Sequence, residues 1–324
     1  MRCGKISRAI LGAVLGVCAA GSAYAQGYPA KPIRFILPFP PGGPSDLLGR
    51  PLGQKLGEQL GVAVVVENRP GAGGNLGLES AAKAPPDGYT LVLGAPPIAI
   101  SPSLYARLNY DPQKDLAPIS LVAVVQNVIL VHPSVPARSL KELIQVARSQ
   151  PGKLNFGSGG IGTTSHLAPE LLQSLNAIKM VHIPFKGVGQ ASIGLLSGEV
   201  DVLVMGAPAA ASHVNAGKAR PLAVLSSARA PALPKVPTVI EAGLEHFIVE
   251  LWYGVLAPGG TPPNIVNRLN NEIHKALGSA DMKEKLSAAG VEPRLSTPEQ
   301  FAGFIRAETI RFAKVIKDAG IRAE

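Results

Sequence analysis

Short apolar runs alternate with amphipathic segments along almost the whole chain. The apolar runs that predict strands cover residues 33–38, 62–67, 89–94, 154–157, 180–184, 201–205, 222–226 and 250–256. The amphipathic segments that predict helices cover residues 46–60, 77–83, 139–149, 164–175, 189–196 and 208–216. Alternating strands and helices are typical of parallel sheets with crossover helices, and strands that are apolar on both faces fit a sheet covered by helices. The pattern therefore predicts an α/β fold built on mostly parallel sheets.

The segment 119–132 is an apolar run that is long for one strand. We expect either two strands there or one long strand that crosses between two domains. Nearer the end of the chain, Thr261 and Thr297 each precede a proline and a helical apolar pattern, over residues 265–277 and 301–319. These helices are too few and too amphipathic to form a separate domain, so we expect them to pack back on the first sheet.

The first 25 residues have the pattern of a secretory signal peptide. Basic residues at positions 2, 5 and 8 precede an apolar run over residues 9–20, and residues 23–25 (Ala-Tyr-Ala) match the small-residue cleavage pattern. The apolar run is shorter than the roughly 20 residues that span a bilayer. We therefore expect cleavage after Ala25 and a mature protein in a bacterial periplasm. Residues 15–18 resemble a lipoprotein cleavage site, but Val17 is large for the position before a lipidated cysteine, so we do not expect lipidation.

Removing 25 of the 324 residues leaves 299, which suits two domains. We expect lobe 1 to be discontinuous, with residues 26–126 and 245–324, and lobe 2 to comprise residues 127–244. Both cysteines, Cys3 and Cys18, lie in the expected signal peptide, so the mature chain has neither a disulfide nor a thiolate metal site.

Basic residues are scattered along the chain. The sequence has 31 Lys and Arg against 22 Asp and Glu, and loss of the signal would lower the formal net charge from +9 to +6. Nucleic-acid binding favours a basic stripe with interleaved aromatic residues, and the chain has no such stripe. We therefore expect no nucleic-acid partner, although a mildly positive surface would help to attract small anions.

Two strand–glycine turn–helix junctions carry the candidate binding chemistry. The first runs from Pro38 to Asp46 and the second from Gly157 to His166. Glycine lets the backbone approach a ligand closely, and the helix start that follows offers unpaired N–H groups and a partial positive charge. Such a junction can hold an anion without an arginine. The candidate ligand-binding residues of the two junctions are Pro41, Gly42, Gly43, Ser45, Asp46, Ser158, Gly159, Gly160, Thr163 and Thr164.

Either junction alone also fits an ordinary structural turn, in which Ser45 and Thr163 act only as helix caps. Two junctions, one in each expected lobe, favour a shared ligand site, because the strand ends of two facing α/β lobes point into one cleft. Four or five charge-assisted contacts there would support micromolar binding, about −8 kcal/mol, after the cost of association.

Enzymatic alternatives find less support in the chain. Residues 157–162 match the dinucleotide fingerprint G-x-G-x-x-G, but no acidic residue follows between 171 and 198, where the fingerprint needs one. The chain has no G-x-S-x-G nucleophile elbow and no H-E-x-x-H pair. The remaining alternative is an exported hydrolase that uses Ser158 or Ser165 with His166. We expect no catalytic residue, no metal and no cofactor.

A further set of short segments runs through the whole mature chain. Residues 38–46 read P-F-P-P-G-G-P-S-D, and residues 67–75 read E-N-R-P-G-A-G-G-N. Others follow at residues 87–91, 156–160, 184–187, 234–238, 252–254 and 257–263. With these segments, in this order, the sequence resembles the Bug-type (TctC-like) periplasmic substrate-binding proteins of tripartite tricarboxylate transporters, whose first ligand loop usually reads P-F-x-P-G-G-G-x-D.

The resemblance implies a two-lobed, hinged α/β receptor with a type II periplasmic-binding-protein fold. It implies that backbone amides and bridging waters of two loops hold a small carboxylate, that the lobes close on it, and that a permease with large and small membrane subunits receives it. It adds Phe39, Asn75, Lys186 and Gly187 to the candidate ligand-binding residues. We expect a monomer. The sequence leaves open a receptor that serves only a signalling sensor.

Departures from the family pattern lead to further expectations. Pro44 replaces a usual glycine and removes one N–H from the first loop. Gly49 and Pro51 lie inside the first expected helix, which we therefore expect to start late or to kink. The segment 94–100 is more apolar than the polar segment of the family at this place, so we expect the ligand to carry an apolar or aromatic part beside its carboxylate.

Overall fold

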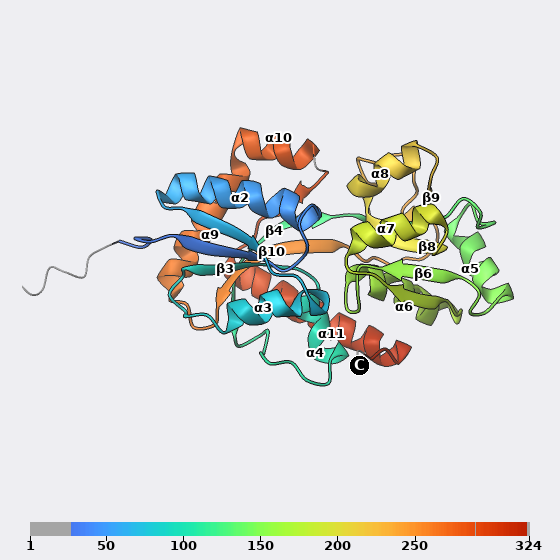
Figure 1. Ribbon diagram of the computed structural model, residues 1–324, viewed down its shortest axis with the longest axis horizontal. Coiled ribbons are helices and arrows are strands. Elements are labelled where there is room, and N and C mark those ends of the chain that lie inside the picture. Colours follow the sequence, from blue (N-terminus) through green and yellow to red (C-terminus); the bar gives the residue numbers. More distant parts are fainter. Residues whose placement is uncertain (1–26, 289, 323–324) are drawn as a thin grey trace, which may run out of the picture.

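The computed structural model describes residues 27–288 and 290–322, which form two α/β lobes side by side (Figure 1). The expected signal peptide, residues 1–25, lies outside this range. Within the described part, no helix combines the length and the apolar character needed to cross a bilayer. No three His, Cys, Asp or Glu side chains of that part are grouped as a metal site.

The first sheet has six strands in the order β11-β4-β10-β3-β1-β2. Its strands are β1 (Ile33–Leu37), β2 (Val64–Asn68), β3 (Thr90–Gly94), β4 (Leu116–Val125), β10 (Leu251–Pro258) and β11 (Glu292–Pro293). Its helices are α2 (Pro44–Leu60), η2 (Ala72–Gly74), α3 (Asn75–Ala82), α4 (Pro97–Leu104), α9 (Pro263–Gly278), α10 (Ala280–Ala288) and α11 (Pro298–Ala319). Strand β1 pairs in parallel with β2 and β3, whereas β10 runs antiparallel to both of its neighbours.

The second sheet has five strands in the order β7-β6-β8-β5-β9. Its strands are β5 (Asn127–Val131), β6 (Asn155–Ser158), β7 (Val181–Pro184), β8 (Val202–Gly206) and β9 (Arg220–Val224). Its helices are α5 (Leu140–Ser149), α6 (Thr164–Asn176), α7 (Val188–Ser197) and α8 (Ala207–Asn215). Strand β6 is parallel to β7 and β8, whereas β5 is antiparallel to β8 and β9. The predicted α/β class is therefore confirmed, and each sheet adds antiparallel strands to a parallel core.

The chain passes between the two sheets at two places. The apolar run 119–132 forms two strands, β4 and β5, which belong to different sheets and are separated by Gln126 alone. The return passage leads from β9 into β10, which begins at Leu251. The first sheet is thus assembled from two separate stretches of the chain, and the C-terminal helix α11 lies under both lobes in Figure 1.

Helix α2 differs from the expectation of a late start. It is continuous from Pro44 to Leu60 and includes Pro51. Pro44 stands at the start of the helix, where its missing N–H has no intrahelical partner to lose. Gly49 fits because a Cβ at this position would lie 2.5 Å from Leu37 Cδ2, so glycine lets α2 pack closely on β1.

The apolar segment 94–100 belongs to the core of the first lobe. It ends β3 and begins α4, a helix that the sequence pattern did not predict. Ile98, Ala99 and Ile100 have no exposed surface and share one apolar cluster with residues of α11. Burial in the core explains the apolar character, so this segment no longer supports an apolar part of a ligand.

Candidate functional site

The first glycine turn lies between β1 and α2 and is held by Asp46. Its carboxylate accepts hydrogen bonds from Gly42 N (3.0 Å), Asn68 Nδ2 (2.9 Å) and Arg50 Nε (3.1 Å). Burial alone would raise the pKa of this carboxyl, but the hydrogen bonds from Asn68, Gly42 and Arg50 hold the pKa below its usual range. Asn68 Nδ2 also donates to Phe39 O at 3.0 Å. Asp46 is therefore an ionised group whose oxygens fix the shape of the turn.

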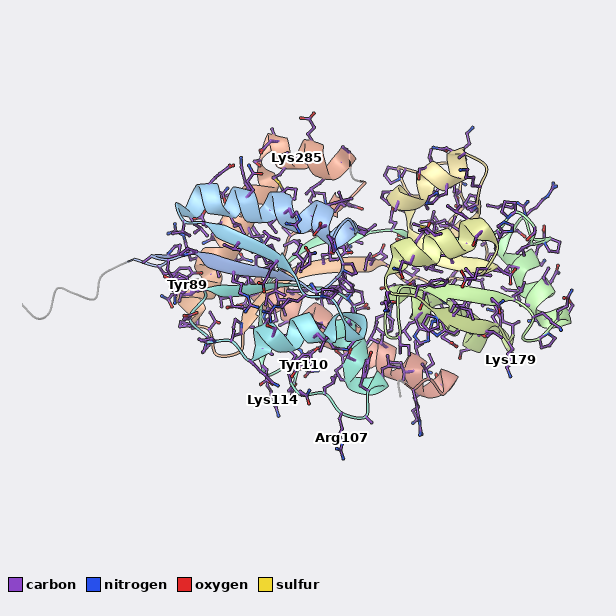
Figure 2. The ribbon with its side chains drawn as sticks, viewed as in Figure 1. Tyr89, Arg107, Tyr110, Lys114, Lys179 and Lys285 are labelled. Atoms are coloured by element: carbon purple, nitrogen blue, oxygen red, sulfur yellow. The ribbon has the colours of Figure 1, made fainter. Side chains whose placement is uncertain are left out.

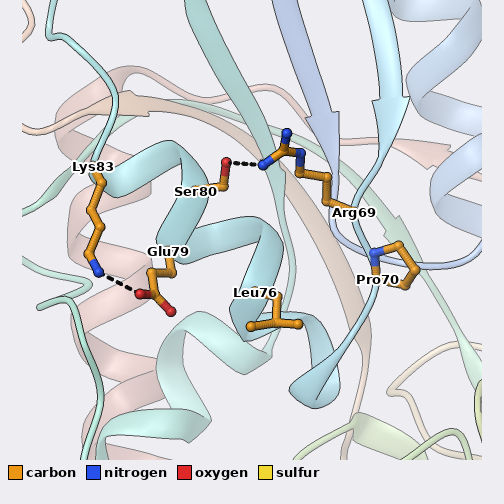
Figure 3. A pocket seen from close by; sticks show the side chains of 6 residues that line it. All are labelled: Arg69, Pro70, Leu76, Glu79, Ser80 and Lys83. Atoms are coloured by element: carbon orange, nitrogen blue, oxygen red, sulfur yellow. Dashed lines mark hydrogen bonds and ion pairs between the residues drawn. The ribbon is translucent and has the colours of Figure 1, made fainter.

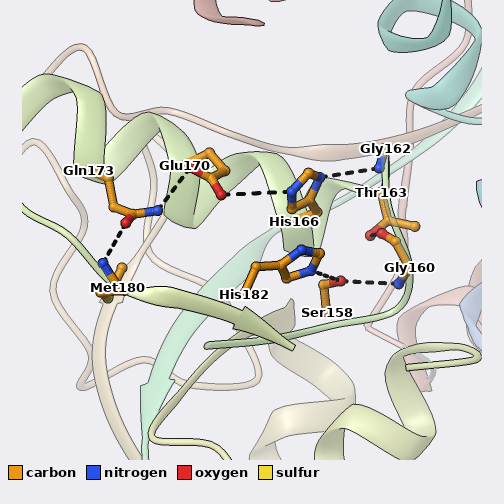
Figure 4. Close-up of polar contacts among 9 residues, drawn as sticks. All are labelled: Ser158, Gly160, Gly162, Thr163, His166, Glu170, Gln173, Met180 and His182. Carbon is orange, nitrogen blue, oxygen red and sulfur yellow. Dashed lines mark hydrogen bonds and ion pairs between the residues drawn. The ribbon is translucent and has the colours of Figure 1, made fainter. Parts of the chain in front are cut away.

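The second glycine turn lies between β6 and α6, and side chains of the turn and of α6 bind its amides (Figure 4). The pairs are Gly159 N with Ser165 Oγ at 2.9 Å, Gly160 N with Ser158 Oγ at 3.1 Å, and Gly162 N with His166 Nδ1 at 3.2 Å. Thr163 Oγ1 donates to Gly160 O at 2.7 Å. The amides of Gly159 and Gly160, which were expected to bind a ligand, are thus already bonded within the protein.

Each of the two glycine turns contacts a segment of the opposite lobe. A Cβ on Gly187, which follows β7, would lie 3.6 Å from Pro40 Cγ in the first turn. A Cβ on Gly73, in η2 of the first lobe, would lie 2.5 Å from Ile161 O in the second turn. The structure therefore brings both turns to one junction between the lobes.

Two buried hydroxyls directly after these turns have no hydrogen-bond partner among the described residues. They are Ser45 Oγ and Thr164 Oγ1, on residues that are 1% and 6% exposed. Each belongs to the first turn of its helix, α2 or α6, and neither helix has a side-chain N-cap bond. A buried hydroxyl without a partner costs about 1–3 kcal/mol. Ser101 Oγ and Trp252 Nε1 are also buried without a partner in the described part of the chain, so Ser45 and Thr164 are distinguished by their place at the two helix starts. An uncapped helix start favours a negatively charged group over a neutral one.

The other candidate residues differ in how they are used. Asn75 is buried, and its Oδ1 accepts a hydrogen bond from the Tyr110 hydroxyl at 2.9 Å. Phe39 is half-buried beside the first turn, whereas Pro41 and the side chain of Lys186 are exposed. Asn75 therefore has a structural role within the first lobe. Phe39 and Lys186 are the larger candidate side chains next to the junction.

The hydrolase alternative fails on the placement of the serine. Ser158 Oγ lies 2.6 Å from His182 Nε2, so the tertiary structure pairs it with a histidine other than His166. Ser158 has no exposed surface, and burial lowers the pKa of His182 to about 4. The Ser158 hydroxyl is bonded to Gly160 N and His182 Nε2, and a histidine with a lowered pKa is a weak base at neutral pH. Ser165 Oγ accepts from Gly159 N and lies 2.9 Å from Thr163 Oγ1, and no hydrogen bond joins it to His166 among the described residues. Sequence reasoning missed His182 because 24 residues separate it from Ser158.

Exposed cations are dispersed over both lobes. Figure 2 shows Lys179 and Lys285 far from each other and from Arg107 and Lys114, which lie nearer together at the lower edge of the first lobe; all four are exposed. These four cations therefore do not form one basic patch.

An open groove of about 500 Å³ lies outside the junction, beside α3 (Figure 3). It is lined by Arg69, Pro70, Leu76, Glu79, Ser80 and Lys83. Its charges are already engaged, Lys83 Nζ with Glu79 Oε1 at 2.5 Å and Arg69 Nη1 with Ser80 Oγ at 2.9 Å. The groove shares no residue with either turn and offers no comparable place for an anion.

The chain is similar to known proteins along most of its length. The family model described as "Tripartite tricarboxylate transporter family receptor" matches residues 48–321. Protein BugT of Bordetella pertussis is 40% identical over 312 residues, which are 96% of this chain and 95% of the relative. The solved structure of R. palustris Rpa4515 with adipate has a TM-score of 0.85 at 36% identity and covers 91% of this chain and 99% of that one. MatC from Rhodopseudomonas palustris with bound malate has a TM-score of 0.82 at 32% identity, with 89% and 100% covered.

Proposed function

Because this chain belongs to the tripartite tricarboxylate transporter receptor family, we propose that it captures a small organic carboxylate between its lobes and delivers it to a membrane permease. The family consists of solute receptors and not of enzymes. Solved relatives include the periplasmic binding protein BugD, and two others hold adipate and malate. The family and these ligands together favour a carboxylate over other anions.

The observation that carries this proposal is the pair of unpartnered hydroxyls, Ser45 Oγ in one lobe and Thr164 Oγ1 in the other. An ionised carboxylate only accepts hydrogen bonds, so hydroxyls and helix-start amides are the donors that it needs. Charge-assisted hydrogen bonds contribute about 1.5–3 kcal/mol each. Four or five of them support a micromolar complex, about −8 kcal/mol, after the cost of association.

We propose two kinds of role for the candidate residues. Those that face the carboxylate or border it are Gly43, Ser45, Thr163, Thr164, Phe39, Pro41, Lys186 and Gly187. Those that hold the turns in shape are Gly42, Asp46, Asn75, Ser158, Gly159 and Gly160. The internal hydrogen bonds of the second set leave the helix starts and their hydroxyls as the main donors.

Phe39 supports a ligand with an apolar part. Its ring is half-buried in the first turn. Burial of a methylene chain of the ligand against this ring would stabilise the complex by about 0.8 kcal/mol per CH₂. Adipate has such a chain between its carboxylates, whereas malate carries a hydroxyl on a shorter one. We therefore expect adipate to bind more tightly than malate.

The passages between the sheets, at Gln126 and before Leu251, support a hinged receptor whose second lobe begins near residue 127. Its expected end at residue 244 precedes Phe247 and Val249, which pack in the second lobe and favour a boundary a few residues later. The pattern of residues 1–25 supports cleavage after Ala25 and a periplasmic location. The proposed partners are the large and small membrane subunits of the permease, and the receptor is proposed to act as a monomer.

Calorimetry with adipate and malate tests the proposal, with a thermal-shift screen of other carboxylates beside it. A ligand at 100 times its dissociation constant stabilises the folded state by about 2.7 kcal/mol, which such a screen detects. Ser45→Ala and Thr164→Ala should each weaken binding by about tenfold or more. They should not lower the stability of the unliganded protein and should raise it by up to about 1–3 kcal/mol, because each removes a buried hydroxyl that has no partner among the described residues.

Ser192→Ala is the matched control. Ser192 is also a buried serine, but its Oγ lies 3.0 Å from His213 Nε2, away from both turns. We expect this variant to lose stability and to keep its affinity for adipate. Failure of every carboxylate to bind the wild-type protein, or unchanged affinity in Ser45→Ala and Thr164→Ala, would contradict the proposed site.

A further inference from the structure

Two stacked histidines lie behind the second turn, outside the set of residues that face the carboxylate. His166 belongs to α6 and His182 to β7, and their ring centroids are 4.1 Å apart with planes inclined by 23° (Figure 4). Phe156 stacks against His182, with centroids 4.8 Å apart. His166 is 4% exposed. Both rings are bonded to the turn, so they do more than fill the core.

His166 accepts a hydrogen bond from the second turn. Gly162 N lies 3.2 Å from His166 Nδ1. An amide N–H is always a donor, so Nδ1 is unprotonated and the proton of the neutral ring is on Nε2. Nε2 faces Glu170 Oε1 at 3.8 Å, and Glu170 Oε2 accepts a hydrogen bond from Gln173 Nε2 at 2.9 Å. The Nε2–H tautomer therefore fits its surroundings on both sides.

His182 accepts from the same turn through Ser158. Gly160 N donates to Ser158 Oγ at 3.1 Å, and this oxygen lies 2.6 Å from His182 Nε2. A serine hydroxyl that accepts from an amide still has its own proton to donate, and His182 Nε2 is the acceptor within reach. His182 then carries its proton on Nδ1, which is the opposite tautomer to that of His166.

We infer that His166 and His182 are positioning residues for ligand capture, because the stacked pair holds the amides of Gly162 and Gly160 and so fixes the turn that leads into Thr164. The inference rests on the proposed function, in which this turn faces the carboxylate. Gly160 and Gly162 have φ of 122° and 80°, in the region where glycine backbone has the most freedom. The two acceptors hold the second turn in one conformation before the ligand binds. The turn therefore loses less conformational entropy on binding.

A direct electrostatic role for the pair does not fit its surroundings. Burial, and for His166 also the neighbouring His182, lowers the two pKa values to about 3 and about 4, so both rings are neutral at pH 7. Among the described residues, the titratable side chain that contacts the pair, besides the two rings themselves, is Glu170, whose pKa is raised by burial. The hydroxyls and helix-start amides, and not the histidines, therefore interact with the charge of the ligand.

The tautomers test this inference on the unliganded protein. In ¹⁵N NMR spectra of the full mature chain at pH 7, we expect neutral His166 with its proton on Nε2 and neutral His182 with its proton on Nδ1. The Gly160 and Gly162 amides should exchange slowly with solvent. A cationic ring, or His182 with its proton on Nε2, would overturn the assignment.

Paired substitutions test the consequence for capture. The side-chain oxygen of His182→Gln can take the place of Nε2 as an acceptor, whereas His182→Leu has similar bulk and no acceptor. With adipate as the probe, calorimetry should show binding weakened about tenfold or more for His182→Leu and within about threefold of wild type for His182→Gln. His166→Asn and His166→Leu make the same comparison at Nδ1. Equal affinities within each pair would refute a positioning role.

The two proposals fail in different ways. If adipate does not bind the wild-type protein, the proposed carboxylate function is in error for this ligand, while the tautomers and amide exchange still decide the role of the histidines. If the leucine variants do not fold, the spectra and the affinities of His182→Gln and His166→Asn decide it, because loss of binding in these folded variants would contradict a role as acceptors.

Discussion

Replacing Gly73 with alanine should weaken ligand capture by keeping the lobes apart. A Cβ at Gly73 would lie 2.5 Å from Ile161 O, an atom of the opposite lobe, whereas ordinary Cβ contacts begin at 3.4 Å. The obstacle is a backbone carbonyl, which cannot rotate away as a side chain would. The methyl group therefore acts as a wedge that opens the junction by about 1 Å.

Two separate costs follow from this change. Gly73 has a φ of 66°, and an L-residue in this left-handed conformation costs about 1–2 kcal/mol whether or not the lobes touch. The wedge acts only when the lobes touch, because a gap of about 0.5–1 Å removes a quarter to a half of the attraction between the facing atoms. It also lengthens hydrogen bonds to a ligand held from both sides. We expect a loss of at least about 1.4 kcal/mol in binding, which is tenfold in the dissociation constant.

Gly61→Ala separates the two costs. Gly61 caps α2 with a φ of 68°, and a Cβ there would meet no atom within 4 Å, so this variant has the backbone strain without the wedge. Urea unfolding of the unliganded protein should show similar losses of stability in both variants. Calorimetry with adipate should show weaker binding only for Gly73→Ala. Equal affinities in the two variants would mean that contact between the lobes at Ile161 is not needed for capture, and the reasoning would be wrong.

Three further predictions concern pH and single side chains. The free energy of unfolding of the unliganded protein should fall as the pH drops from 6.5 towards 4, because unfolded histidines, with a pKa of 6.5, bind protons that folded His166 and His182 do not. Urea unfolding at a series of pH values should show this slope, and His182→Gln should reduce it. Asp46→Asn keeps the shape of the side chain but removes the charge that accepts from Gly42 and Arg50, so the melting temperature and the affinity for adipate should both fall; wild-type values would contradict the assigned role. Thr297→Ala removes the capping box of α11 and should cost about 1 kcal/mol of stability in thermal unfolding, while calorimetry should find the affinity for adipate unchanged.

Much of the fold follows from local patterns in the sequence. The helix expected after Thr297 is present and begins with a capping box that has both of its hydrogen bonds, and Ser139 caps α5 by accepting from Glu142 N. Helix α4 escaped prediction because its apolar residues are buried and show no amphipathic period. Helix α10 follows α9 after Ser279 alone and has few buried residues, so its pattern did not stand out.

The positions of the two glycine turns follow from short-range rules, because a strand, its turn and the helix after it are neighbours along the chain. Which of their groups remain available to a ligand depends on long-range packing. Gly160 is held through Ser158 by His182, and Gly73 lies close to Ile161 of the other lobe. These residues are too far apart along the chain for a local sequence pattern to predict the contacts. Whether an amide or a hydroxyl is already bonded depends on partners that folding brings from elsewhere in the chain.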